Sequence, residues 1–422
     1  MRIALLAYRG SMKSGGLGIY LRDLTRELAR LGHEMDLFVG PPYPDPLPWL
    51  TTIRIHNEQY WDRLFTASWR APLPQHDPFR AFSPLNFFEL AATRFGFLPE
   101  PFSFSVRAAR MIHARMRAGL RYDLIHDVQT LGYGLLWLRA LGLPTVSTIH
   151  HPLTIDRRFS LRRDRTFKER KGTLTFYPVR TQARVARRID ALITSSEASI
   201  HELQVGFGVS RRRIHNVANG VELPPQHPKR ARRARPVLLF LGRTRDPNKG
   251  LEHLLEAMAL LSADVTLRVL DDHPTPGEIR LHALIADLKL HERVRFEGKL
   301  PRPQLETVLG EVDIVVVPSL FEGFGLPAVE ALAAGTPVVA SSAGALPEVV
   351  ALAGTGTLVP PGDPRALAAG IEATLAHWDR EHETALASRQ RIERAFSWSQ
   401  VAIRTAAVYD TVLQARHAAR ND

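Results

Sequence analysis

Two carboxylates separated by seven residues, Glu322 and Glu330, flank a glycine-interrupted segment in the second half of the chain. The β-branched run 313–317 before them predicts a buried parallel strand, and Pro327 favours the first turn of a helix, where no backbone donor is needed. Glu322 should therefore follow a strand and Glu330 should lie on the next helix, at the edge where open α/β sheets bind ligands. The pair could act as an acid–base couple, but this setting favours contacts with opposite ends of one ligand.

Backbone amides and cations accompany these carboxylates. The segment Gly323-Phe324-Gly325-Leu326 places amides near the expected helix start, where anionic or polyoxygenated groups bind. A second loop, 242–250, follows the apolar strand 237–241 and carries Arg243 and Lys249 ahead of a predicted helix. Two cations beside helix amides would suit a diphosphate.

A glycine loop near the start of the chain is a further candidate. Gly15 and Gly16 lie between a predicted strand at 2–7 and a predicted helix at 18–31. Amides at such a helix start would favour a phosphate, although a purely structural turn would use the same residues.

A pair of histidines follows another apolar strand, 145–149, again at the ligand edge. Adjacent side chains point in different directions, so His150 and His151 are not expected to share a metal ion. The sequence instead predicts that His150 points into a cleft, and a structural histidine is the alternative.

The composition is that of an ordinary globular chain of 422 residues, 45% hydrophobic and 23% charged. A single core rarely exceeds about 250 to 300 residues, so two domains are expected. The absence of cysteine excludes disulfides, thiolate nucleophiles and cysteine-ligated zinc. The apolar run 3–8 reads as a strand rather than a signal peptide, and no stretch approaches the ~20 apolar residues that span a bilayer. A cytoplasmic protein, or a peripheral one on the inner face of a membrane, is expected.

The positive charge is concentrated in the first half. Residues 1–220 hold 32 Lys+Arg against 18 Asp+Glu, whereas the remainder holds 23 against 25. The densest part is 157–171, with eight basic residues. Such a stretch can be a solvated face, or it can attract anionic lipid or a phosphorylated acceptor. Nucleic acid is less favoured because no recognisable binding motif accompanies the charge.

Apolar runs alternate with helical periodicity along most of the chain, which predicts α/β domains with mostly parallel sheets covered on both faces. Strands are predicted at 2–7, 35–39, 124–126, 145–149, 191–194, 237–241, 266–270, 294–296, 313–317 and 337–340.

Two segments break this alternation. Residues 41–104, rich in proline, phenylalanine and tryptophan, are predicted to be an insertion whose aromatic side chains could shape an acceptor pocket, touch a membrane or pack together. The proline-rich, basic segment 223–236 is the predicted linker. This division predicts two α/β domains, at 1–222 and 237–398, with a final helix at 399–422.

Together these motifs closely resemble the retaining glycosyltransferases of family 4, the group 1 glycosyltransferases with the GT-B fold. The resemblance covers about residues 1–413, apart from the insertion, and includes the segments 313–319, 335–339 and 396–398. Asn219 also lies in an Asn-Gly-Val loop like that of the family.

The resemblance implies a donor site shared between two facing Rossmann-like domains. It implies that Glu330 binds the donor ribose, and that Glu322 with the amides of 323–326 holds the transferred sugar and its phosphate. Arg243 and Lys249 would neutralise the diphosphate. The family's remaining site positions fall on Gly15, Gly16, His150 beside the donor sugar, and Asn219.

The same resemblance implies a nucleotide-diphosphate sugar as co-substrate, most simply a UDP or GDP form, with no metal and no other cofactor. The acceptor, a hydroxyl compound that could be lipid-linked or anionic, would bind the basic first domain. The final helix would cross back onto that domain.

Glycosyl transfer needs the departing phosphate stabilised as the anomeric carbon becomes cationic, which fixed cations and a helix start can do without a metal. No Asp-x-Asp triplet occurs, and Asp271-Asp272 is expected only to decorate a loop. The alternatives are Glu322 as a nucleophile, an epimerase or hydrolase of the same architecture, and a non-catalytic nucleotide-sugar or lipid-binding protein. A nicotinamide-dependent oxidoreductase is less favoured because the glycine loop lacks its fingerprint.

Overall fold

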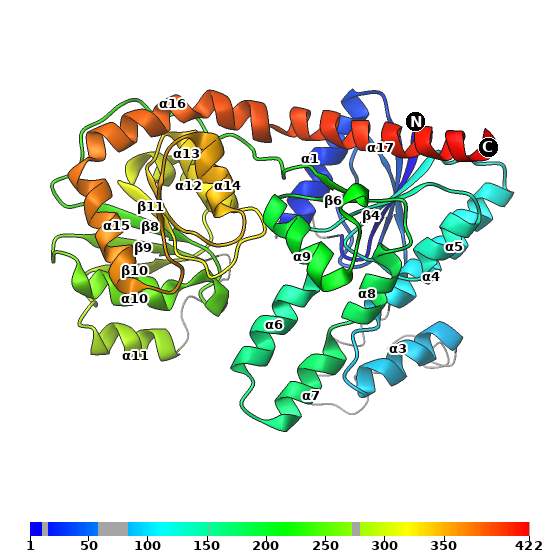
Figure 1. Cartoon of the computed structure of the whole chain (residues 1–422), viewed down its shortest axis with the longest axis horizontal. Helices are drawn as coiled ribbons and strands as arrows, with labels where there is room; N and C mark the ends of the chain where they lie inside the picture. Colours follow the sequence, from blue (N-terminus) through cyan, green and yellow to red (C-terminus); the bar gives the residue numbers. More distant parts are fainter. Residues whose placement is uncertain (11–15, 58–82, 151, 272–278, 422) are drawn as a thin grey trace. The chain divides into compact units, whose positions relative to one another are not determined.

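The computed structural model describes residues 1–10, 16–57, 83–150, 152–271 and 279–421. The chain folds into two compact units (Figure 1). The first unit comprises Met1–Ser195, Ser199–Val217 and Val401–Asp422, and the second comprises Ser196–Ala198 and Ala218–Gln400.

The first unit is built on a seven-stranded, wholly parallel sheet in the order β3-β2-β1-β4-β5-β6-β7. The central strands β1, β4 and β5 are almost fully buried, as expected for strands with helices on both faces. The strands are β1 (Arg2–Ala7), β2 (Glu34–Val39), β3 (Thr51–Arg54), β4 (Leu124–Val128), β5 (Thr145–Thr148), β6 (Ala191–Thr194) and β7 (Ile214–Asn216).

Helices cover this sheet (Figure 1). Phe104 and Ile112, on α4, are fully buried in the core that contains Leu6 and Ile125 of the sheet. The helices are α1 (Gly16–Arg30), α3 (Pro84–Arg94), α4 (Glu100–Arg117), α5 (Gly134–Ala140), α6 (Leu153–Arg163), α7 (Phe167–Phe176), α8 (Val179–Ala186), α9 (Glu197–Phe207) and α17 (Trp398–Asn421).

The second unit has a six-stranded parallel sheet in the order β10-β9-β8-β11-β12-β13. Alternate residues of each strand point to opposite faces and enter separate cores. Val315 and Val317 join the core with α12, α13, α14 and α16, while Ile314 and Val316 join the core with α10, α11 and α15.

The strands of this unit are β8 (Val237–Leu241), β9 (Thr266–Leu270), β10 (Val294–Glu297), β11 (Ile314–Val317), β12 (Val338–Ser341) and β13 (Thr357–Val359). Its helices are α10 (Leu251–Leu260), α11 (Ile279–Asp287), α12 (Arg302–Glu311), α13 (Leu326–Ala334), α14 (Leu346–Ala353), α15 (Pro364–Ala376) and α16 (Trp378–Phe396).

The predicted insertion at 41–104 is only partly separate from the sheet. Residues 51–54 form β3 and pair with β2, and α4 begins at Glu100 and carries Phe104 into the core. The sequence did not reveal β3 because this strand is only half-buried. It did not reveal α4 because this helix begins among prolines. The aromatic residues Trp61 and Trp69 lie outside the described residues.

The predicted linker 223–236 has no helix or strand but is fixed to the second unit. The Arg230 guanidinium donates to Asp313 Oδ1 at 3.0 Å and lies over the Trp378 ring, 4.8 Å from its centroid. His227 Nε2 is 2.9 Å from the carbonyl oxygen of Glu306. These contacts anchor the segment along α12, β11 and α16.

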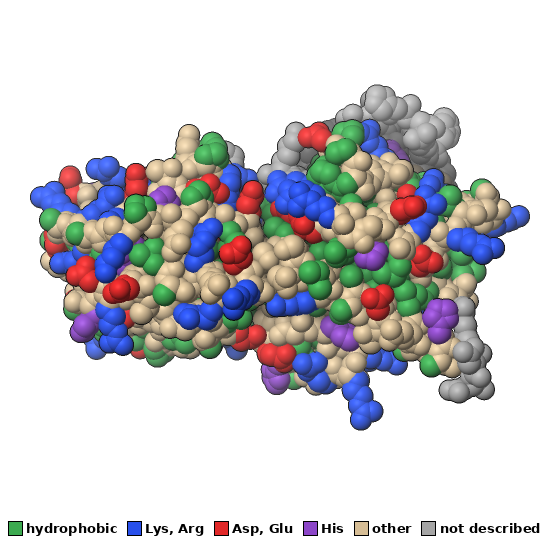
Figure 2. All heavy atoms as spheres, turned by 90° about the horizontal axis from the view of Figure 1, so that it is seen from above, with side chains coloured by type: hydrophobic (Ala, Val, Ile, Leu, Met, Phe, Trp, Pro, Cys, Tyr) green, Lys and Arg blue, Asp and Glu red, His purple; other side chains and the backbone are tan. Residues whose placement is uncertain are grey.

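On the face shown in Figure 2, basic and acidic side chains are interspersed over each unit, so no single patch there carries the net charge. Within the described part of the chain, no helix combines the length and the apolar character that crossing a bilayer requires.

Candidate active site

Glu322 lies in the loop after β11, as the sequence predicts, and its side chain is held from two sides. Lys249 Nζ donates to Glu322 Oε1 at 2.7 Å, and Ser319 Oγ donates to the same oxygen at 2.9 Å. Glu322 is 8% exposed, whereas the Lys249 side chain keeps 27% of its surface exposed. The carboxylate therefore fixes the ammonium group at the carboxyl edge of the sheet, with donors left for a further anion.

The loop that carries Lys249 is locked to the end of β11 by its backbone. Gly250 has φ 72°, and a Cβ atom there would lie 2.0 Å from the carbonyl oxygen of Pro318. The Leu320 amide donates to the Asn248 carbonyl at 2.7 Å. Only glycine permits this approach, so the loop that carries Lys249 and the loop that carries Glu322 are held together through their backbones.

The other cation, Arg243, lies in the same β8–α10 loop and is exposed. The loop is anchored by Asp271, which accepts hydrogen bonds from the Thr244 amide at 3.2 Å and from the Thr244 hydroxyl. Asp271 is 2% exposed, so the expectation that it only decorates a loop is wrong. The sequence did contain a signal for this role. Asp271 follows β9, which is next to β8, and neighbouring parallel strands end at the same edge, so Asp271 could be expected near the β8–α10 loop.

The segment 323–326 leads into α13 as predicted. Gly325 is the N-cap at φ 91°, Leu326 begins the helix and Gly335 ends it at φ 87°. Phe324 is 6% exposed and makes an edge contact with Phe396, with centroids 5.2 Å apart. Its side chain is therefore part of the core, and a ligand would meet this segment through its backbone.

Glu330 projects from the second turn of α13 and pairs with Arg302, at the start of α12. The Arg302 guanidinium also donates to Glu306 Oε1 at 2.8 Å and to the Glu222 carbonyl. Burial raises the pKa of Glu330, and the adjacent guanidinium opposes that shift. The sequence motifs did not indicate Arg302, because its partner lies on another helix.

In the first unit, His150 follows β5, as predicted. Its ring makes an edge contact with Tyr20 of α1, with centroids 4.2 Å apart, and its backbone amide donates to Gln129 Oε1 at 3.1 Å. Gln129 has φ 62° in the loop after β4, and Asp127 supports that loop by accepting the Leu131 amide at 3.0 Å. Burial raises the pKa of Asp127 to about 6.

The two glycines of the first unit and the hinge asparagine complete the predicted set. Gly15 lies outside the described residues, and Gly16 is the first residue of α1. Asn219 lies in a loop that Val221 anchors by donating its amide to the Phe396 carbonyl at 2.8 Å. Within the second unit, the structure brings Lys249 and Glu322 into direct contact, and Glu330 lies on the helix that follows the Glu322 loop.

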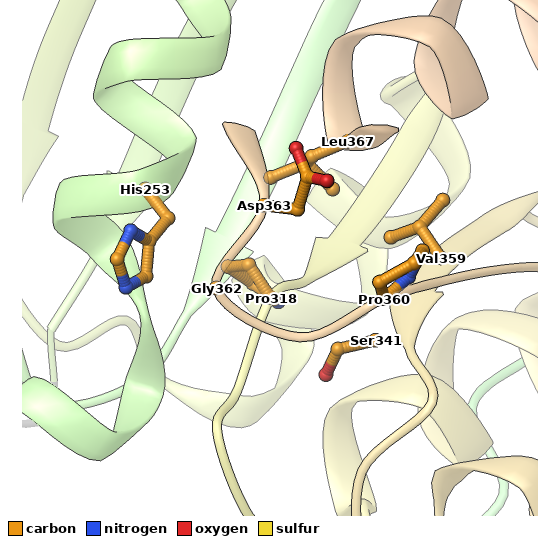
Figure 3. Close-up of a pocket in the computed structure, with 8 residues that line it drawn as sticks. All are labelled: His253, Pro318, Ser341, Val359, Pro360, Gly362, Asp363 and Leu367. Atoms are coloured by element: carbon orange, nitrogen blue, oxygen red, sulfur yellow. The ribbon is translucent and has the colours of Figure 1, made fainter. Parts of the chain in front are cut away.

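A small pocket opens at the carboxyl ends of β11, β12 and β13 (Figure 3). His253 and Asp363 are the titratable groups in its lining. Asp363 already accepts the Arg365 and Ala366 amides, each at 3.0 Å, as the N-cap of α15. None of the sequence-predicted site residues lines this pocket, so it is not the predicted donor site.

Comparison with protein families gives two matches that together span most of the chain. Residues 14–223 match the model described as Glycosyltransferase Family 4, and residues 225–391 match the model described as Glycosyl transferases group 1.

Two curated relatives match over almost their whole length. The chain is 38% identical to an MMP alpha-(1->4)-mannosyltransferase of Mycolicibacterium hassiacum, covering 98% of both chains. It is 29% identical to a D-inositol 3-phosphate glycosyltransferase of Catenulispora acidiphila, covering 97% of this chain and 94% of the relative.

Solved structures share the fold. A sucrose-phosphate synthase from Thermosynechococcus elongatus superposes with a TM-score of 0.72 at 25% identity, covering 98% of this chain and 99% of that one. The Anabaena protein HepE, solved in complex with UDP-glucose, has a TM-score of 0.68 at 20% identity, covering 97% of this chain and 100% of that one.

Proposed function

The chain belongs to glycosyltransferase family 4, and from that premise we propose that it transfers a mannosyl group from a nucleotide-diphosphate sugar to an acceptor hydroxyl, with retention and without a metal. The observation that carries the donor assignment is the Lys249–Glu322 pair, fixed at the carboxyl edge of a parallel sheet beside the start of α13. The mannosyl assignment is supported by the name of the relative at 38% identity.

The chemistry proposed for this site is stabilisation of a leaving diphosphate. As the bond between C1 and the phosphate oxygen breaks, negative charge develops on the phosphate, and the Lys249 ammonium and the amides at the α13 start would meet it. The acceptor oxygen forms its bond to C1 on the same face, and its proton passes to the departing phosphate oxygen. Arg243, in the Lys249 loop, is proposed to add a second positive charge.

Glu322 is proposed to orient Lys249 and to accept hydrogen bonds from the sugar rather than to attack C1. One carboxylate oxygen already accepts from both Lys249 and Ser319, which stabilises the anion and lowers its nucleophilicity. Glu330 is proposed to hold the ribose hydroxyls, and His150 to lie beside the donor sugar.

Product analysis tests this function. The purified protein is incubated with UDP- and GDP-linked sugars, GDP-mannose included, with and without sugar acceptors and with excess EDTA. We expect an acceptor-dependent product whose new linkage keeps the donor's anomeric configuration by NMR, at a rate that EDTA leaves unchanged. Free sugar or an epimerised donor formed equally without acceptor would instead identify a hydrolase or an epimerase.

The basic stretch is proposed to place the enzyme on an anionic membrane surface at the cytoplasmic side. The stretch, residues 157–171, runs from within α6 into α7 of the first unit, and the Thr166–Glu169 capping box begins α7. Two exposed aromatic residues lie near these charges. Phe167, the first residue of α7, is 84% exposed. Phe95 is 75% exposed, and its neighbour Gly96 lies beside Thr175 of α7. Cations attract lipid headgroups and aromatic rings insert at the interface.

Vesicle sedimentation checks this surface. Binding to phosphatidylserine vesicles should fall about 100-fold when Lys168, Arg170 and Lys171 are all changed to Gln, at about 1 kcal/mol for each charge. The matched control changes Arg232, Arg233 and Arg235 to Gln, which removes the same charge from the second unit and should have little effect. Equal binding to neutral vesicles, or no response to salt, would contradict the proposal.

A further inference from the structure

A buried row of polar side chains connects the C-terminal helix to the predicted site histidine within the first unit. The Tyr409 hydroxyl, on α17, lies 2.7 Å from His126 Nδ1, and His126 Nε2 lies 2.7 Å from Thr148 Oγ1. Thr148 Oγ1 lies 3.2 Å from the Tyr20 hydroxyl. All four residues are at most 3% exposed. They come from α17, β4, β5 and α1, so the row joins two neighbouring inner strands to two helices far apart in sequence.

The protonation state of His126 couples the members of the row. Burial lowers the pKa of His126 to about 3, so its imidazole is neutral near pH 7. A neutral imidazole donates through one nitrogen and accepts through the other. If the Tyr409 hydroxyl donates to His126 Nδ1, then Nε2 must donate to Thr148 Oγ1. If Nδ1 instead donates to Tyr409, then Thr148 must donate to Nε2. The hydrogen-bond direction set at Tyr409 is therefore imposed on Thr148.

The far end of the row contacts His150. Thr148 holds the Tyr20 hydroxyl, and the Tyr20 ring makes the edge contact with the His150 ring at 4.2 Å and 77°. His150 is two residues beyond Thr148, the last residue of β5, so the chain that leaves this strand also joins them. The ring of His150 thus rests on a side chain whose position depends on the buried row.

We propose that Tyr409 is a positioning residue for His150, acting through His126, Thr148 and Tyr20. The C-terminal helix thereby sets the orientation of a histidine at the carboxyl edge of the first sheet. The kinetic part of this inference rests on the proposed role of His150 beside the donor sugar, whereas the positioning itself does not.

The Tyr409→Phe variant tests the row because it removes one hydroxyl and keeps the ring. We expect kcat to fall about fivefold to tenfold, with the donor KM unchanged within twofold. Tyr122→Phe is the matched control: the Tyr122 hydroxyl donates to Asp36 at 2.6 Å in the same unit, away from the row. It should lower the melting temperature and leave kcat unchanged.

A double-mutant cycle separates positioning from a general structural effect. If Tyr409 acts through His150, Tyr409→Phe should change kcat by less than twofold in a His150→Ala background. A full fivefold to tenfold loss in that background would overturn the proposal. Thr148→Val interrupts the row at a second point and should reproduce the kinetic pattern if Tyr409→Phe does not fold.

Histidine nitrogen NMR supplies a readout that needs no activity. In Tyr409→Phe the His126 and His150 ring signals should both move, while in Tyr122→Phe they should not. If the wild-type protein transfers no sugar but these signals move, the proposed function fails and the positioning row stands. If transfer is normal and the His150 signal stays in place, the row fails and the function stands.

Discussion

Replacing Lys249 with alanine is expected to lower kcat/KM about 10²- to 10³-fold, the loss typical when one preorganised charge-stabilising donor is removed from a reaction centre. Lys249 is held 2.7 Å from Glu322 by a loop whose backbone is packed against β11, so its ammonium is fixed before any ligand arrives. Because the negative charge on the diphosphate grows as the glycosidic bond breaks, most of the loss should appear in kcat. Steady-state kinetics with the best donor measures this.

Three controls separate the loss of the Lys249 charge at the site from a change in net charge and from a loss of folding. Lys299→Ala removes an exposed lysine from the loop after β10 in the same unit and should leave kcat/KM within twofold. Lys249→Arg keeps the charge and should recover part of the rate. Lys249→Ala also removes the cationic partner of the buried Glu322 carboxylate, so we expect a lower melting temperature. A folded Lys249→Ala protein with wild-type kcat would contradict the leaving-group assignment.

Replacing Glu330 with alanine is expected to raise the donor KM about 100-fold. Two hydrogen bonds from ribose hydroxyls to a carboxylate contribute about 1.5 to 3 kcal/mol each, and discounting for imperfect geometry leaves about 3 kcal/mol, or a factor of about 100. The ribose does not change during the reaction, so these contacts are equal in ground and transition states and kcat at saturation should change little. Donor titration by calorimetry and steady-state kinetics measure both quantities.

The matched control is Glu306→Gln, since Glu306 bonds the same Arg302 guanidinium from α12 at 2.8 Å without lying on α13. It should change the donor KM less than threefold. Glu330→Gln keeps one acceptor oxygen and should fall between alanine and wild type. Wild-type donor affinity and turnover in Glu330→Ala would refute the ribose assignment.

Acidification should weaken donor binding through the same carboxylate. Burial raises the pKa of Glu330, so its proton returns at a higher pH than that of an exposed glutamate, although Arg302 limits this rise. The protonated form accepts fewer hydrogen bonds, so donor KM should increase as the pH falls. Glu330→Gln should flatten this dependence, since its side chain does not titrate.

The buried strands could be predicted from sequence, whereas of the edge strands only β10 was predicted. β1, β6, β8 and β9 begin and end at the predicted residues, because runs of mainly apolar residues mark strands covered on both faces. β3, β7 and β13 were missed, and each lies at the edge of its sheet. An edge strand has a neighbouring strand on one side only. The edge strands 51–54 and 357–359 are short and many of their side chains are partly exposed, so their sequences resemble those of loops.

For the site, the sequence indicated the positions of groups but not their partners. The strand–loop–helix order placed Glu322 and Lys249 at one sheet edge, because parallel strands end together. It could not show that Arg302 pairs with Glu330 or that Tyr409 reaches His126, since those contacts depend on side-chain direction across 28 and 283 residues. The pairing of Asp271 with Thr244 could not be predicted for the same reason, although the position of Asp271 at the end of β9 could.

Backbone contacts between the site loops affect how this chain can evolve. A Cβ on Gly250 would meet the Pro318 carbonyl, and one on Gly344 would meet the Glu322 carbonyl, each at 2.0 Å, so the loops after β8, β11 and β12 hold one another through backbone atoms. Substitutions among the side chains around the donor can then change which sugar or base is accepted without displacing the loops. Substrate preference can diverge among descendants of this chain while the glycines that join the loops are retained.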